Sequence, residues 1–411
     1  SAASDVYKRQ VYTLLVALGT GCTDKFEEYN TNPFGPKPDQ MLGDNAITGS
    51  LIKSMIPALV QGQQNNSQML DQMIGSEYGG EITCIAQWGN GGNYYTYNPR
   101  VGWYGNMFDT TMPQIYTGYF QIRDLSDGKG LAYQWAQILR VAASLKISDC
   151  YGPIPYSQIT GTAFTVEYDN MEDLYKHMFD DLDEAISAFK VAVLGNEDMS
   201  SLSEYDLVFN GDFNKWVKFA NSLRLRLAMR LAFVKPEVAK EQAEKAISHS
   251  LGVITSNDDN AGVKTVGAND VVNQLYTMWA NYKDIRMGAS IWSILTGYED
   301  PRLSKMFTQG TLNETSGYFA LRTGLNLDSN KDSRLGYSSP NIQSNTPIIW
   351  INAAEVAFLK AEGALRGWNM GGATPQSAYE EGIRLSFNEW GASGANEYMT
   401  DEVKKAANYV C

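Results

Sequence analysis

Apolar residues recur at helical spacing through much of the chain, and this periodicity constrains the fold more than any other feature. Within each periodic segment they stand three or four positions apart, as Trp135, Leu139 and Ala142 do. Such spacing places apolar side chains on one face of a helix, where they can be buried together. The pattern runs through residues 131–149, 170–189, 213–233, 236–250, 352–368 and 374–390. The sequence therefore predicts an all-α protein.

Local signals mark where these helices begin and how they pair. Asn170 stands where an N-cap belongs, with Asp173 at the third helical position, and Pro236 suits a first turn. Alanines of 351–368 supply the small residues that closely packed helix pairs need, which favours tetratricopeptide-like hairpins. Long loops interrupt the pattern, so we expect a distorted helical-repeat scaffold. An unrelated helical bundle would share most of these helices.

Two long segments, about 75–130 and 251–346, lack helical periodicity and are rich in glycine, asparagine and aromatic residues. Irregular stretches of this length in a compact chain usually carry function. We therefore expect the ligand-binding loops in these two segments.

Aromatic side chains gather within both irregular segments. In residues 88–104, WGNGGNYYTYNPRVGWY, six of seventeen residues are Trp or Tyr, and a second cluster includes Trp279 and Tyr282. A flat ring can cover the apolar face of a sugar, while asparagine and free backbone groups bond its hydroxyls. The cluster, Tyr94 and Tyr95 included, is therefore predicted to contact a glycan. The alternative is that each ring merely packs a loop onto the scaffold.

Charge and motifs exclude several other classes of function. The formal charge of −13, with no basic stripe, argues against nucleic acid as a partner. His177 and His249 have no second candidate ligand beside them, and nucleotide-binding and nucleophile fingerprints are missing from the sequence. The acidic run at 180–184 spreads around a helix, whereas a glycosidase needs two carboxyl groups facing across a cleft. We therefore predict no enzyme activity and no cofactor.

One loop and two cysteines carry weaker signals. Asp328, Asn330 and Asp332 occupy the first, third and fifth positions of a calcium-loop pattern, which then loses its glycine and its final glutamate. A plain polar loop is the favoured interpretation, and calcium is the alternative. Cys84 and Cys150 could form a disulfide in an oxidising compartment, although two buried thiols are the favoured arrangement.

The N-terminal residues resemble the signal of a bacterial lipoprotein. The apolar run 11–21 follows Lys8 and Arg9 and ends in small residues immediately before Cys22. It is about half the length of a membrane-spanning helix, so it fits a secretory signal. We expect residues 1–21 to be removed, Cys22 to carry the lipid, and residues 22–411 to form one domain anchored through that lipid.

Several strings of sequence together carry a family likeness. Residues 149–156, DCYGPIPY, match an Asp-x-Tyr-Gly-x-Ile-Pro-Tyr element, and EDPRL at 299–303 contains an Asp-Pro-Arg-Leu turn. INAAEVAFLKAEGALRGW at 351–368 and FEEYNTNP after Cys22 complete the set. In these strings the chain resembles the SusD/RagB family of outer-membrane, glycan-binding lipoproteins of Bacteroidetes, and the resemblance covers nearly the whole chain from Cys22.

The resemblance implies a fold, a partner and a site. The fold would have four tetratricopeptide-like helix pairs supporting an irregular ligand-binding half. The partner would be a SusC-like, TonB-dependent transporter of the outer membrane, to which an oligosaccharide or starch-like glycan is delivered at the cell surface. By position, Trp88 and Asn90 resemble contacts of the first loop, and Trp279 and Tyr282 resemble contacts of the later insertion.

Two further expectations follow from the same resemblance. Relatives run on beyond residue 411 with further helices, so the sequence is expected to be truncated at its C-terminus. Some members of the family capture peptides or other nutrients, which leaves a peptide-binding role as the alternative to glycan binding. A helical glycoside hydrolase and a peptide-binding scaffold of the tetratricopeptide type are the remaining alternatives.

Overall fold

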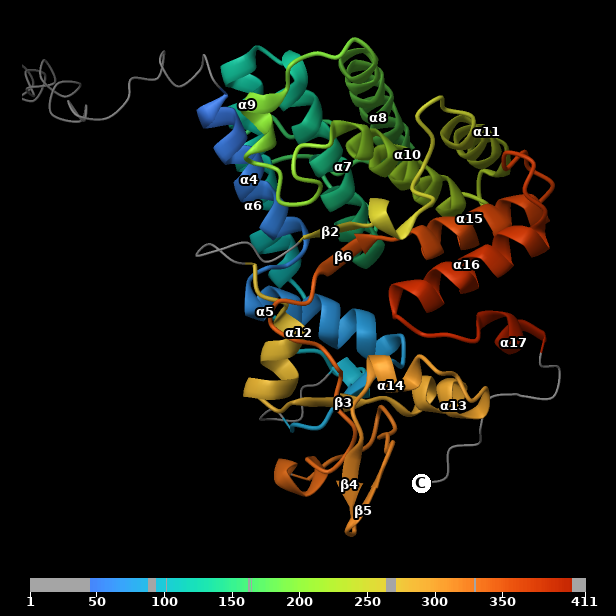
Figure 1. Cartoon of the computed structure of the whole chain (residues 1–411). Helices are drawn as coiled ribbons and strands as arrows, with labels where there is room; N and C mark the ends of the chain where they lie inside the picture. Colours follow the sequence, from blue (N-terminus) through green and yellow to red (C-terminus); the bar gives the residue numbers. More distant parts are fainter. Residues whose placement is uncertain are drawn as a thin grey trace, which may run out of the picture. The chain divides into compact units, whose positions relative to one another are not determined.

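The computed structural model of the chain describes residues 45–87, 94–100, 102–161, 163, 165–263, 271–328 and 330–400 (Figure 1). The chain divides into two units, residues 1–44 and 45–411, and all of the described residues belong to the second. Long helices dominate this unit, and its strands are short. The prediction of an all-α fold is confirmed.

Eight helices form four successive pairs, as the resemblance implied. The two helices of each pair pack on each other, and the first helices of successive pairs, α4, α7, α10 and α15, also contact one another in order. This is the packing of a helical-repeat array, in which each pair buries the apolar face of its neighbour. The pairs are α4 (Ala46–Leu59) with α6 (Asn106–Ser126), α7 (Gly130–Tyr151) with α8 (Met171–Leu194), α10 (Phe213–Arg230) with α11 (Pro236–Ile247), and α15 (Ala353–Leu365) with α16 (Pro375–Glu389).

The helices begin where the sequence signals place them. The Asn170 side chain accepts a hydrogen bond from the backbone N–H of Asp173 at 3.0 Å, and Pro236 occupies the first turn of α11. At the start of α16, Thr374 and Ser377 form a reciprocal capping box. Each cap satisfies backbone N–H groups that have no partner inside the helix.

The predicted apolar faces form the core between the pairs. Trp135 of α7 and Trp216 of α10 are fully buried, and their rings meet at 5.2 Å in a T-shaped contact, with Phe213 against Trp135 at 5.3 Å. A fully buried large apolar side chain contributes about 1.5–3 kcal/mol. These aromatic contacts therefore fix adjacent helix pairs to one another.

The DCYGPIPY element closes the connection between α7 and α8. The carboxylate of Asp169 accepts hydrogen bonds from the backbone N–H groups of Tyr156 at 2.8 Å and Ser157 at 2.9 Å. The Tyr156 hydroxyl bonds Asp181 of α8, which also pairs with Arg140 of α7. The family-like string thus has a structural role, because it ties two helices and their connecting loop together.

The prediction that residues 75–130 are irregular is wrong for its second half, which forms α6. The first pair also contains α4, which the periodicity did not predict. Both helices contain an interior proline, Pro57 in α4 and Pro113 in α6, and interior proline normally indicates a helix end. Apolar residues of α6 such as Ile115, Tyr119 and Ile122 are nevertheless buried at helical spacing.

The segment 251–346 contains only short elements, and all three small sheets are antiparallel pairs. The pairs are β1 (Ile82–Cys84) with β3 (Ile285–Met287), β2 (Ala261–Val263) with β6 (Ile348–Ile351), and β4 (Gly310–Leu312) with β5 (Thr315–Gly317). The remaining elements are α5 (Gln64–Ser67), η1 (Gln68–Ser76), η3 (Tyr94–Thr96), α9 (Ser200–Ser203), η4 (Asn257–Asp259), α12 (Gln274–Tyr276), η6 (Thr277–Asn281), α13 (Ala289–Gly297), α14 (Leu303–Met306), η7 (Lys331–Arg334) and α17 (Ala395–Thr400). Two of these, η1 and η6, are π-helical, a rare conformation that occurs often at functional sites.

Cys84 and Cys150 are both free in the structure. Cys84 is buried, as expected, but the prediction of a second buried thiol is wrong, because Cys150 in the last turn of α7 is exposed. Among the described helices, none is both long enough and apolar enough to cross a bilayer.

Candidate binding surface

Strands β1 and β3 bring the two predicted aromatic clusters into one region. The first cluster follows β1, Trp279 and Tyr282 of the second precede β3, and the strands pair with Cys84 opposite Ile285. The backbone N–H of Ile85 donates to the Asp284 carbonyl at 2.7 Å, which extends the pairing beyond the strands. Segments about 200 residues apart in sequence are thus joined by an antiparallel ladder that lies next to both clusters.

Tyr94 and Tyr95 are buried in this region. They are only 3% and 4% exposed, and the Tyr95 hydroxyl donates to the Ala86 carbonyl at 3.3 Å. Burial raises the pKa of both phenols to about 12, so both stay neutral at physiological pH. Consecutive residues of the short helix η3 (Tyr94–Thr96) turn both rings into the protein, and the predicted contact of Tyr94 and Tyr95 with a glycan stays a prediction.

The exposed aromatic surface lies on neighbouring tyrosines. Tyr97 is 81% exposed and stacks on Tyr78, itself 46% exposed, with ring centroids 5.3 Å apart and planes 21° from parallel. The Tyr78 hydroxyl donates to the Tyr94 carbonyl at 3.2 Å, and that carbonyl also accepts the Tyr97 N–H at 2.8 Å. One buried residue therefore positions both exposed rings.

Tyr104 extends the same surface. Its side chain is exposed, and its backbone carbonyl accepts a hydrogen bond from the Tyr151 hydroxyl at the end of α7. The phenols of Tyr151, Tyr78 and Tyr104 all add to the effect of burial in raising the pKa of Tyr94, which places them around it. We call Tyr78, Tyr97 and Tyr104 the tyrosine shelf.

A buried carboxyl group lies behind the shelf. Glu77, next to Tyr78, is buried at the end of η1, and its Oε1 accepts a hydrogen bond from the Gln72 amide at 2.8 Å. Its Oε2 is buried and, within the described residues, has no hydrogen-bond partner. Burial raises the pKa of Glu77 to about 8, although bonds from Gln72 and the Cys84 backbone oppose the shift. Glu77 is therefore largely protonated at neutral pH.

Trp279 and Tyr282 of the second cluster are partly exposed. The Trp279 indole N–H donates to the Ile342 carbonyl at 2.8 Å, and its ring meets Tyr276 edge-on at 5.8 Å. The Tyr282 carbonyl accepts from Lys331, whose ammonium also pairs with Asp284 at 2.8 Å. Both residues are thus held in place, and ligand contact by either stays a prediction.

Three predicted residues, Trp88, Asn90 and Cys22, lie outside the described residues. Sequence reasoning noted Tyr97 and Tyr104 within the aromatic cluster but did not select them as site residues, and it missed Tyr78. The sequence signal for Tyr78 is weak: it stands directly before a Gly-Gly pair, ten residues before the aromatic run 88–104 begins. Its stacking partner is fixed by tertiary contact.

In the calcium-loop pattern, the first residue, Asp328, has partners within the protein. The Asp328 carboxylate pairs with the Arg334 guanidinium at 2.9 Å and accepts the backbone N–H of Asn330 at 2.8 Å. The hydrogen bond from Arg334 lowers the pKa of Asp328. Across the described residues, no group of three or more His, Cys, Asp or Glu side chains is placed to hold a metal ion. Calcium binding by Asp328, Asn330 and Asp332 stays untested.

The carboxylates of the acidic run 180–184 have structural partners. Asp181 pairs with Arg140, and Asp183 pairs with both Arg224 and Lys245. Asp180 forms an exposed pair with Lys176 at 2.9 Å. These groups link helices or face solvent, so they do not form the opposed pair that glycoside hydrolysis uses.

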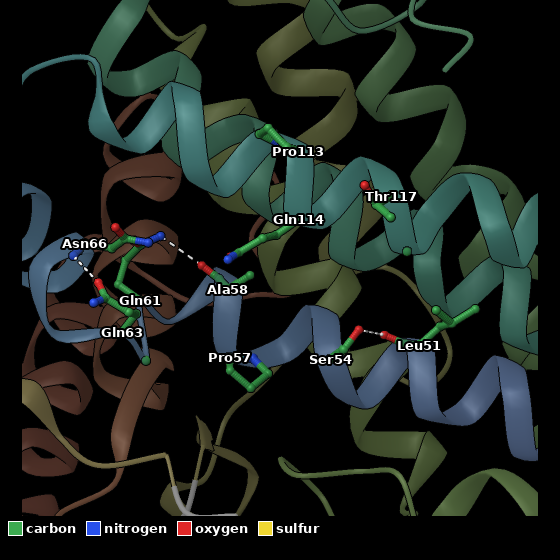
Figure 2. A pocket seen from close by; sticks show the side chains of 12 residues that line it. Leu51, Ser54, Pro57, Ala58, Gln61, Gln63, Asn66, Pro113, Gln114 and Thr117 are labelled. Atoms are coloured by element: carbon green, nitrogen blue, oxygen red, sulfur yellow. Dashed lines mark hydrogen bonds between the residues drawn. The ribbon is translucent and has the colours of Figure 1, made fainter. Parts of the chain in front are cut away.

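A separate hollow of about 500 Å³ lies between α4 and α6. Figure 2 shows Pro57 on α4, Gln114 and Pro113 on α6, and the Gln61 amide donating to the Ala58 carbonyl at 2.9 Å. Its lining contains amides, hydroxyls and prolines but neither aromatic nor charged side chains. This composition suits the polar outer face of a terminal helix pair, so the tyrosine shelf is the better candidate for ligand binding.

Paired helices that hold exposed tyrosines on loops define a helical-repeat binding protein. Residues 28–411 match the model of the SusD-like family, described as Susd and RagB outer membrane lipoprotein. The chain belongs to this family. No curated protein matches it in sequence.

Solved structures of the same family superpose over most of the chain. A SusD-like protein from Bacteroides thetaiotaomicron is 34% identical, and the match covers 89% of this chain and 74% of that one with a TM-score of 0.83. A chitin-binding SusD homologue from Flavobacterium johnsoniae is also 34% identical, with 90% and 75% covered and a TM-score of 0.80. A SusD homologue from Bacteroides uniformis is 34% identical, and the match covers 89% of this chain and 75% of that one with a TM-score of 0.80.

Proposed function

We propose that this protein binds oligosaccharides, starch-like glycans among them, at the tyrosine shelf. The observation that carries the proposal is the Tyr97–Tyr78 stack, because it holds two large aromatic rings in one orientation at the surface. An exposed ring held in one orientation offers a sugar an apolar face at little entropic cost. The protein acts as a binding protein without catalysis, and the chitin-binding relative supports a glycan ligand.

The surroundings of the shelf favour weak, reversible binding. Aromatic stacking contributes roughly 0.5–1.5 kcal/mol per contact, and association costs several times that amount. A few stacked rings with shared hydrogen bonds therefore hold a glycan without trapping it. Such binding suits delivery to a second protein, which we propose is a SusC-like, TonB-dependent transporter of the outer membrane.

The proposed location follows from the family and from the N-terminal sequence. The family is described as one of outer membrane lipoproteins, and Cys22 follows a signal-like apolar run. We propose that a lipid on Cys22 anchors the protein with its shelf at the cell surface. Metabolic labelling with palmitate tests this anchor: labelling should be lost in Cys22→Ala, and labelling that persists would contradict it.

Affinity electrophoresis through gels that contain starch, xylan, galactomannan or soluble chitin tests glycan binding by the full chain in detergent. We expect one or more gels to retard the protein, and Tyr97→Ala to migrate about as fast as in a gel without glycan. Tyr379→Ala is the matched control, because Tyr379 is an exposed tyrosine on α16. Equal retardation of Tyr97→Ala and the parent chain would reject the shelf. If no gel retards the parent chain, glycan binding is rejected and peptide binding becomes the stronger candidate.

A further inference from the structure

Two neighbouring hollows share one ion pair beside the shelf. The first, of about 410 Å³, lies between η1 and the end of α7, where it is lined by Ser76 and Cys150 among others. The second, of about 480 Å³, includes Trp350 and Trp390 in its lining. Asp71 and Lys146, whose charged groups meet at 2.7 Å, line both hollows. The two spaces are therefore adjacent parts of one groove.

The first hollow begins beside the tyrosine shelf. Cys150 lines it, and the charge of the Cys150 thiolate contributes to the raised pKa of Tyr94, the residue that positions the shelf. Tyr151, the next residue, bonds the Tyr104 carbonyl. Along α7, Lys146 lies one turn before Cys150, about 6 Å along the helix axis. The last turns of α7 thus connect the tyrosine shelf with the Asp71–Lys146 ion pair.

The second hollow ends the groove with two indole rings. Trp350 in β6 packs against the buried Phe219 at 5.0 Å, and Trp390 follows the last turn of α16; both indoles are partly exposed. Among the described residues, neither indole N–H has a hydrogen-bond partner, so each can donate to a ligand hydroxyl. Ile348 and Ile349 add apolar surface to the same lining.

Charge restricts what the groove can hold. Asp71, Glu81, Asp149 and Glu389 line it, and Lys146 is the one cationic side chain among its described lining residues. Asp149 is paired with Arg230 at 2.6 Å, so Glu81 and Glu389 are the carboxyl groups that have no cationic partner among the described residues. Lys146 is neutralised by Asp71, and Glu389 accepts hydrogen bonds from the amides of Asn352 at 2.8 Å and Asn260 at 3.3 Å. A field of this sign repels carboxylated or sulfated ligands. Carboxylates and amides can instead bond neutral hydroxyls.

We infer that the glycan site continues from the tyrosine shelf through this groove to Trp350 and Trp390, so that the protein selects neutral oligosaccharides of several sugar units. This inference rests on the proposed function, because it assigns further contacts to the same ligand. Each hollow has the volume of a small-molecule pocket. Shelf and groove together therefore contact more of a chain than a disaccharide offers.

Calorimetry with oligosaccharides of two to eight units, prepared from starch, xylan, galactomannan and chitin, tests the inference on the full chain in detergent. In the series that binds, we expect affinity to rise about tenfold with length, and Trp390→Ala to remove that rise while leaving disaccharide affinity unchanged. Trp390→Phe, which keeps a ring, should restore most of it. Trp368→Ala is the control, because Trp368 lines neither hollow.

The outcomes separate this inference from the proposed function. Affinity that does not depend on length, or a Trp390→Ala variant that binds octasaccharides like the parent chain, would overturn the groove and leave the shelf intact. Acidic oligogalacturonides that bind as tightly as the neutral series would overturn the selection by charge. Failure of all four neutral series to bind the parent chain would overturn the proposed function itself. Thermal unfolding of each variant checks that it folds.

Discussion

Tyr97 lies face to face on Tyr78, and both residues are tied to the same backbone carbonyl, that of Tyr94. The buried residue thus determines where the exposed rings stand. Tyr97 itself adopts a φ of 55°, in the left-handed region that aromatic residues rarely occupy. The shelf therefore combines a strained backbone with a solvent-exposed ring, a combination that stability alone does not favour.

Substitutions at Tyr97 should separate binding from stability. Tyr97→Ala and Tyr97→Gly both remove the ring, so we expect both to lose glycan retardation in affinity gels. Alanine still carries the cost of a left-handed conformation, roughly 1 kcal/mol, whereas glycine does not. Urea unfolding should therefore find Tyr97→Gly more stable than Tyr97→Ala by about that amount. The reverse order would show that the left-handed backbone at this position is not strained.

The buried Glu77 predicts a pH dependence of stability. Its pKa is raised from 4.5 to about 8 in the folded protein, so the folded state keeps a proton that the unfolded chain loses. The contribution of the protonated Glu77 to the free energy of unfolding is complete below pH 4.5. It is lost as the pH rises to about 8, and the loss is about 1.4 kcal/mol per pH unit. The free energy of unfolding of Glu77→Gln should depend less on pH over this range. Measuring the free energy of unfolding of both proteins at several pH values checks this, and parallel curves would contradict it.

Periodicity predicted six of the eight paired helices, because buried apolar residues repeat along α7, α8, α10, α11, α15 and α16. It missed α4 and α6, where Pro57 and Pro113 lie inside helices that tertiary packing sustains. At the proposed site, aromatic density marked the segment that holds Tyr94 and Tyr97 but not which of its rings are exposed. Tyr94 and Tyr97 stand three residues apart in one cluster, and only the fold turns one inward and the other outward.

Trp88 lies at the start of the same aromatic cluster, and its role is still a prediction from sequence. Trp88→Ala should lower glycan affinity without lowering the melting temperature, because a ring that serves a ligand contributes little to the core. Calorimetry with the retained glycan and a thermal melt provide the two measurements. A lower melting temperature with unchanged affinity would identify Trp88 as a packing residue instead.

Replacement of the buried Arg140 guanidinium should destabilise the scaffold strongly. It lies over the rings of Tyr119 at 4.2 Å and Tyr156 at 4.3 Å and pairs with Asp181. Arg140→Met removes the cation and leaves the Asp181 charge without its partner, which typically costs about 3–5 kcal/mol. The matched control is Lys176→Met, which breaks the exposed pair with Asp180.

The exposed pair should contribute little to stability, because solvent screens both charges. We therefore expect urea unfolding to show a large loss of stability for Arg140→Met and almost none for Lys176→Met. Asp181→Asn combined with Arg140→Met should recover part of the loss, since the unpaired buried charge is then gone. If both single variants lose the same small amount, the contacts of Arg140 with Tyr119, Tyr156 and Asp181 do not hold α6, α7 and α8 together, and apolar packing alone must do so.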